Sequence, residues 1–206
     1  AIFIAGSSRI VVIFGIAVFV CINVSKLFDN KEIDFIISKS ISRQQFILSF
    51  LTGYLISALF VITPLIIILN ILANLDGYGA FIWSVSLVFE TLIVVCFAFL
   101  CSLVLENSLL AIFATVTFYI ISRMMGFFVM QISLPWEESM KNPTIYEYTL
   151  KALSVIFPRL DLFTQSKWLI YGASDLLVVK IIVIQGLIYI PLLIFMAFYD
   201  ISKKEF

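Results

Sequence analysis

The sequence contains no histidine, and charged residues make up only 13% of its 206 positions. Without histidine the chain cannot build His-ligated metal sites, HExxH protease motifs or any nucleophile that histidine activates. A soluble domain usually carries about 25% charged and about 45–50% apolar residues. Here apolar residues make up 63%, and the mean hydropathy is +1.15. The composition therefore excludes an ordinary soluble domain and predicts an integral membrane protein.

The chain also lacks an excess of either charge and lacks a phosphate-binding loop. Thirteen basic and 13 acidic residues cancel, so nothing indicates a nucleic-acid partner. No GxxxxGK[ST] motif is present, so the chain cannot bind ATP as P-loop proteins do. Cys21, Cys96 and Cys101 lie in apolar stretches without CxxC spacing, and we expect them to be buried. We expect no cofactor or metal: the adjacent Met124 and Met125 point about 100° apart on a helix, which does not suit a copper site.

Five apolar segments are long enough, or nearly so, to cross a bilayer as helices. A span needs about 20 apolar residues to cross about 30 Å of hydrocarbon. Runs this long and without alternation suit helices rather than barrel strands. We predict an all-α integral membrane fold in one transmembrane domain, with five visible spans at residues 10–28, 46–72, 81–105, 109–130 and 181–198.

The basic residues orient these spans only weakly. The predicted cytoplasmic side carries Lys26, Lys31, Lys39, Arg43, Lys203 and Lys204, and the other side carries Arg9, Lys141, Lys151, Arg159, Lys167 and Lys180. Cations weigh most in short loops that adjoin spans, so we place 25–45 and the C-terminal tail in the cytoplasm and 131–180 outside. An odd number of spans that begins outside predicts one earlier span. We expect a multi-pass protein of the plasma (inner) membrane.

The charged insert at 29–45 predicts a short amphipathic helix on the membrane surface. Isoleucines at 33, 36, 37 and 41 recur at helical spacing, with polar residues towards the other side. Ser42 and Gln45 form a capping box, which predicts a break and a new helix from Arg43. The alternative is a plain interfacial loop whose basic residues meet anionic lipid headgroups.

The stretch EIDFIISKSISRQQFILSFLTGY, at 32–54, leads from the insert into the second span. It is similar to the signature region of the type-2 family of ABC exporter permeases, and the matching residues are Glu32, Ser38, Ser42, Arg43, Phe46, Ile47 and Gly53. Ser40 and Ser49 replace the usual proline and lysine of that region. VIFPRLDLFTQSKWLIYG at 155–172 resembles the element before the family's last span, and FYDISKKEF at 198–206 resembles its short basic ending.

The resemblance implies a six-helix permease subunit that works with a separate ATPase. One span would precede Ala1, and the helix at 31–43 would dock in a cleft of an ATPase subunit that carries ATP and magnesium. The coupling role would fall on Lys31, Glu32, Asp34, Phe35, Ser38, Lys39, Ser42 and Arg43. A dimer of ATPase subunits needs two docking points, which implies a second copy of the permease or a related one. Apolar paths between helices in contact with membrane lipids suit a lipid-like, glycan or amphipathic substrate.

Glu90 and Arg123 are the ionisable residues that the predicted spans place deep in the bilayer. A lone charge at the centre of a membrane helix costs about 2.5–3.5 kcal/mol on insertion scales, so such residues face protein or water. The tight turn at 106–108 makes their helices neighbours, so an ion pair is geometrically possible. This pair could fix helix packing, line a substrate path or contact the second subunit.

The segment 131–180 is too apolar for a free external loop. We expect short helices on the outer leaflet before the last span, forming an external cap, with Trp168, Leu169 and Tyr171 in an aromatic belt.

Two other classes of function are weighed against the exporter. A small substrate-binding membrane subunit or a secondary transporter would need no ATPase, but such transporters carry inverted repeats or broken helices, which are not seen here. An intramembrane enzyme would need a histidine, a paired-carboxylate motif or a Gly-Asp catalytic motif. We therefore expect this chain not to be an enzyme, and ATP hydrolysis to belong to its partner.

Overall fold

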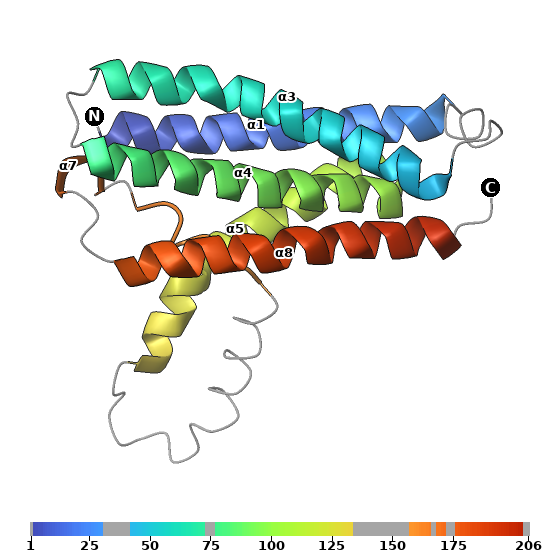
Figure 1. Cartoon of the computed structure of the whole chain (residues 1–206). Coiled ribbons are helices and arrows are strands. Elements are labelled where there is room, and N and C mark those ends of the chain that lie inside the picture. Colours follow the sequence, from blue (N-terminus) through green and yellow to red (C-terminus); the bar gives the residue numbers. More distant parts are fainter. Residues whose placement is uncertain are drawn as a thin grey trace, which may run out of the picture.

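The fold is a bundle of long helices (Figure 1). The computed structural model describes residues 2–30, 42–72, 77–133, 157–165, 168–171 and 176–203. Its helices are α1 (Ile2–Asp29), α3 (Arg43–Leu72), α4 (Gly77–Leu105), α5 (Ser108–Ser133), α7 (Trp168–Tyr171) and α8 (Leu176–Lys203). Within the described residues, five helices are long and apolar enough to cross a membrane, which confirms the predicted number and the helical class.

The first helix begins earlier than the sequence predicts. We expected a span from Ile10, with Arg9 outside it, but α1 already begins at Ile2. The apolar residues Ile2, Phe3 and Ile4 continue the helical pattern towards the N-terminus, so Arg9 lies inside the helix rather than before it. The expected boundary is therefore wrong, and Arg9 joins Glu90 and Arg123 as a charged residue away from the ends of the long helices.

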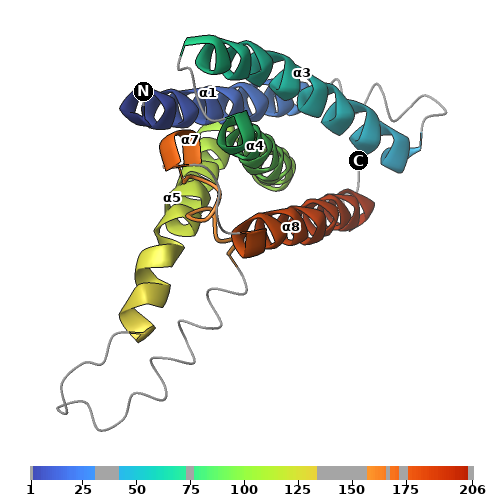
Figure 2. The same ribbon diagram turned by 60° about the vertical axis from the view of Figure 1, so that its left-hand side comes forward.

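Helix α4 forms the centre of the bundle. It contacts α1, α3, α5, α7 and α8. In its most apolar 18-residue stretch, 72% of the residues are buried, against 17% in the corresponding stretch of α3. Figures 1 and 2 show α1 and α8 on either side of α4, while the second half of α5 turns away from the other helices. Because α4 is enclosed, a polar side chain on its buried face must find its partners on neighbouring helices.

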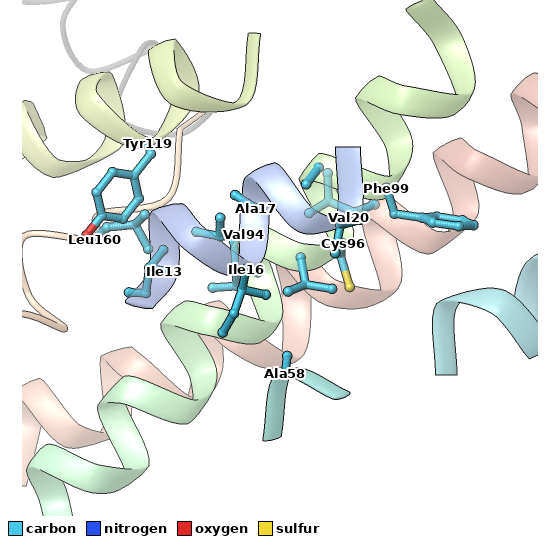
Figure 3. Close-up of a cluster of buried hydrophobic side chains, with 14 of the residues drawn as sticks. Ile13, Ile16, Ala17, Val20, Ala58, Val94, Cys96, Phe99, Tyr119 and Leu160 are labelled. Carbon is cyan, nitrogen blue, oxygen red and sulfur yellow. The ribbon is translucent and has the colours of Figure 1, made fainter. Parts of the chain in front are cut away.

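The face of α1 that meets α4 is a continuous buried stripe. Ile13, Ile16 and Val20 from α1 are buried in the same cluster as Val94 and Phe99 of α4 (Figure 3). All three cysteines are buried free thiols, as predicted. On the α8 side, Gly186 lets the ring of Phe89 come against the α8 backbone, where a Cβ atom would overlap the ring. Glycine at such a contact permits close helix packing.

The ends of the described helices form two groups at opposite ends of the bundle. The end of α1, the start of α3 and the end of α8 lie together, whereas the end of α3, the start of α4 and α7 lie at the other end (Figure 1). Helix α3 begins with the predicted capping box: the Ser42 amide donates to Oε1 of Gln45 at 3.2 Å, and the Gln45 amide donates to Oγ of Ser42 at 3.3 Å. The remainder of the predicted surface helix, 31–41, lies outside the described residues.

Candidate functional site

Glu90 is the centre of a buried cluster of charged and polar side chains. It lies on α4, 13 residues after Gly77, which places it about 20 Å along that helix. Its side chain is fully buried. A buried carboxylate is stable only when it is paired and hydrogen-bonded, so its partners determine what the site can do.

Arg9 of α1 is the closest partner of Glu90, and sequence reasoning missed it. Nε of Arg9 donates to Oε2 of Glu90 at 2.5 Å, and Nη2 donates to Oγ of Ser86 at 3.1 Å. The guanidinium also lies over the ring of Trp83, 5.3 Å from its centroid. Arg9 is completely buried, so this pair is shielded from any surrounding solvent.

A helical-periodicity argument could have found Arg9. It shares the buried face of α1 with Ala5, Ile13, Ile16 and Val20, which recur at spacings of three and four. An arginine on the apolar stripe of a membrane helix needs a carboxylate partner, and Glu90 is the acidic residue deep in the long helices of the described part of the chain. The preceding Ser7 and Ser8 resemble the polar end of a span, so the helical spacing that places Arg9 on the buried face was overlooked.

Arg123 reaches Glu90 mainly through a tyrosine. Nη1 of Arg123 lies 3.9 Å from Oε1 of Glu90, which is too long for a hydrogen bond. Nη1 donates instead to the hydroxyl of Tyr119 at 2.6 Å, and that hydroxyl donates to Oε1 of Glu90 at 3.1 Å. The predicted proximity of Glu90 and Arg123 is therefore present, but Tyr119 bridges the pair and Arg9 holds the shorter contact.

The cluster carries one positive charge more than Glu90 can neutralise. Arg9 and Arg123 face a single carboxylate, both of whose oxygens already accept hydrogen bonds. Nη1 of Arg9 and Nε1 of Trp83 are buried donors without a hydrogen-bond partner in the described structure. The Arg123 side chain is 28% exposed, whereas Arg9 is sealed. The arrangement can thus attract an anionic group, and Arg123 is its accessible side.

The segment 157–165 packs on α5 next to Arg123. The amide of Leu160 donates to the carbonyl oxygen of Ser122 at 3.2 Å, and the carboxylate of Asp161 lies against Gly126, where a Cβ atom would overlap it. Asp161 also accepts a hydrogen bond from Nη2 of Arg159 at 3.0 Å. This second charge pair is balanced within itself, so it leaves the excess charge of the first cluster unchanged.

The external cap is described only in part. Residues 157–165 and α7 are placed, and Trp168 and Leu169 are buried rather than exposed in an aromatic belt. Residues 134–156 lie outside the described part of the chain. Of the predicted coupling residues, Ser42 is an exposed helix cap and Arg43 begins α3. Lys31, Glu32, Asp34, Phe35, Ser38 and Lys39 lie outside the described residues.

Comparisons with known family models, curated proteins and solved structures find no match to this chain.

Proposed function

We propose that the chain is a membrane-spanning permease subunit of an ABC exporter, driven by a separate ATPase that docks at 31–43. The observation that carries the proposal is the junction into α3. The Ser42–Gln45 capping box starts a 30-residue apolar helix directly after the insert that the sequence predicts to be amphipathic. The similarity to the type-2 permeases spans this same junction. A docking helix that leads directly into a span can pass movement of a partner into the bundle.

Features of the same bundle end are compatible with a docking site. The end of α1, the start of α3 and the end of α8 lie together there (Figure 1). A cavity of about 230 Å³ opens between α3 and α8, lined by Gln44, Ile47, Phe198, Ile201 and Ser202. Side chains of a docked partner could enter this cavity. In the proposed arrangement, closure of the ATPase dimer on ATP would shift the start of α3 and open the permease dimer to the outside.

The test is charge reversal at the proposed docking helix. Glu32→Lys combined with Arg43→Glu should abolish copurification of the ATPase and ATP-dependent export, while the permease still inserts in the membrane. A matched control is Glu138→Lys with Lys180→Glu, which reverses one charge of each sign on the predicted external side. If the docking variant keeps the ATPase and transports at the wild-type rate, the proposal is wrong.

The buried charge cluster favours a second candidate, an ion-coupled secondary transporter. Ionisable residues inside membrane helices commonly mark ion or substrate paths. This candidate predicts transport by the purified chain in vesicles with an ion gradient and without any ATPase. The exporter predicts no transport under those conditions.

A further inference from the structure

An exposed apolar stripe borders the accessible arginine of the cluster. Ile120, Met124 and Phe127 of α5 are 47%, 48% and 58% exposed. Residues three or four apart are neighbours on a helix surface, so Ile120 and Phe127 adjoin Arg123. The surface therefore offers one guanidinium beside an apolar strip of about two helical turns. We name Arg123 and these three residues the α5 surface.

The charge of the cluster determines what this surface attracts. Within the described residues, Arg9 and Arg123 share the single carboxylate of Glu90, which leaves one net positive charge. Nη1 of Arg123 lies 3.9 Å from Oε1 of Glu90, so the guanidinium is close to the carboxylate but is not hydrogen-bonded to it. An arginine within a membrane span is costly until it meets an anion or water, and one excess charge is neutralised by one monoanion.

We propose that the α5 surface binds a membrane lipid with a singly charged anionic headgroup. The phosphodiester of such a lipid would accept hydrogen bonds from the guanidinium of Arg123, and an acyl chain would lie along Ile120, Met124 and Phe127. Arginine suits this contact because its planar donors match phosphate oxygens. A soluble anion would gain the charge contact but nothing from the apolar stripe. The inference does not rest on the exporter proposal, because the α5 surface would bind such a lipid whether the lipid is transported or only bound to the protein.

The stability of the cluster and its ligand should depend on each other. Tyr119 links Arg123 to Glu90, and Glu90 holds Arg9, so a headgroup on Arg123 acts on one connected network. Neutralising the excess charge favours the folded bundle. Lipid binding should therefore raise the unfolding temperature of the bundle as well as occupy the α5 surface.

The experiment is a lipid titration of the full chain in mild detergent, followed by native mass spectrometry. Phosphatidylglycerol is compared with phosphatidylcholine of the same acyl chains, because only the first has a net negative charge. The wild type should bind phosphatidylglycerol about tenfold more tightly, because both lipids offer a phosphodiester to Arg123 but the choline cation of phosphatidylcholine cancels its charge. Arg123→Gln should remove this preference and Arg123→Lys should keep most of it.

Arg159→Gln combined with Asp161→Asn is the matched control, because it removes an arginine without leaving the carboxylate of Asp161 unpaired beside α5. Arg159 is 29% exposed, close to the 28% of Arg123, but Asp161 already neutralises it. This variant should keep the preference for phosphatidylglycerol. The proposal is overturned if the wild type shows no preference, a result that needs no variant to fold, or if Arg123→Gln leaves the preference unchanged. It is also overturned if inorganic phosphate displaces the lipid at equal concentration, because the site would then recognise a free oxyanion.

Discussion

Arg9 of α1 and Glu90 of α4 are 81 residues apart in sequence and form a buried ion pair at the centre of the bundle. The pair fixes which face of α1 meets α4, because the hydrogen bond from Nε forms only when Arg9 points at that helix. Tyr119 and Arg123 extend the pair to α5. One carboxylate thus ties together α1, α4 and α5, in addition to the apolar packing between these helices.

The first prediction concerns the cost of removing the shared carboxylate. Glu90→Gln leaves two arginines in the bundle without an anion and should lower the stability by about 3–5 kcal/mol, the cost of breaking a buried pair. Arg9→Met combined with Glu90→Leu removes both buried charges and should lose less than Glu90→Gln alone. Thermal unfolding in detergent measures both. Strictly additive effects of Arg9→Met and Glu90→Leu would show that the two residues are not coupled.

The two arginines should differ in importance. Arg9 is sealed and bonds Glu90 directly, whereas Arg123 is 28% exposed and reaches Glu90 through Tyr119. Arg9→Met should therefore destabilise the bundle more than Arg123→Met, because the fully buried Glu90 then loses its shortest charged contact and keeps Tyr119 and the more distant Arg123. The same unfolding measurement compares the two variants. An equal or larger loss of stability for Arg123→Met would contradict the conclusion that Arg9 is the closer partner of Glu90.

Tyr119→Phe tests the bridge itself. Loss of the hydroxyl removes one hydrogen bond from Arg123 and one to Glu90, with an expected cost of about 1–3 kcal/mol. In the Arg123→Met background the same change should cost less, since one of the two bonds is already gone. Equal costs in both backgrounds would mean that Tyr119 does not connect the two charges.

Much of this fold follows from hydropathy alone, because long apolar runs have few alternatives in a membrane. The number of helices, the capped start at Ser42 and the proximity of Glu90 to Arg123 are all predictable from local sequence. Arg9 was missed for a physical reason. A hydropathy window sees Ser7, Ser8 and Arg9 as a polar boundary, whereas the helix continues through them to Ile2. The ion pair with Glu90, a tertiary contact, offsets the free-energy cost of burying an arginine at this position.

The close contacts of glycine are a second feature that sequence alone does not reveal. Gly15, Gly53, Gly126 and Gly186 all lie in predicted spans and look alike in the sequence. In the structure Gly15 and Gly53 have open space at the Cβ position, whereas Gly126 and Gly186 meet Asp161 and Phe89. The difference depends on which helix face is covered, and that is decided by the packing of the whole bundle.

Gly186→Ala should therefore destabilise the contact between α4 and α8. The added methyl group overlaps the ring of Phe89, and overpacking of this kind typically costs about 1–3 kcal/mol. Gly53→Ala is the matched control, since alanine there meets no atom and favours the helix by up to about 1 kcal/mol. Unfolding temperatures should move in opposite directions for the two variants, and a stabilised Gly186→Ala would show that the helices are not in close contact.

Gly126→Ala should loosen the segment 157–165 without unfolding the bundle. The new methyl group would displace the carboxylate of Asp161, which Arg159 also holds. A cysteine introduced at Thr164, on a background without native cysteines, should then react faster with a maleimide. Adding Asp161→Ala removes the overlap and should restore slow labelling, and Gly15→Ala should leave the rate unchanged. Unaltered labelling in Gly126→Ala would place the segment away from α5.

The sidedness of the bundle is the prediction on which the proposed function depends most. Docking of an ATPase requires 25–45 and the C-terminal tail in the cytoplasm, with 74–80 and 131–180 outside. The ends of α1 and α8 lie together, and the start of α4 lies at the other end of the bundle (Figure 1). If the bundle spans a membrane, the segments that adjoin these two ends therefore face opposite sides of it. The helix arrangement does not decide which side is which. The crowding of Lys26, Lys31, Lys39 and Arg43 in one short loop favours the cytoplasm for that end.

Single-cysteine labelling with a membrane-impermeant maleimide decides the orientation. The background variant lacks Cys21, Cys96 and Cys101, which are buried and so would react slowly in any case. A cysteine at Asp76 or Lys141 should react in intact cells, and one at Lys39 or Lys203 should react only after permeabilisation. If cysteines at Lys39 and Lys203 are labelled from the same side of the membrane, the helix arrangement is supported. The side from which they are labelled tests the proposed function. The reverse pattern would put the proposed docking helix outside the cell, where no ATPase could reach it.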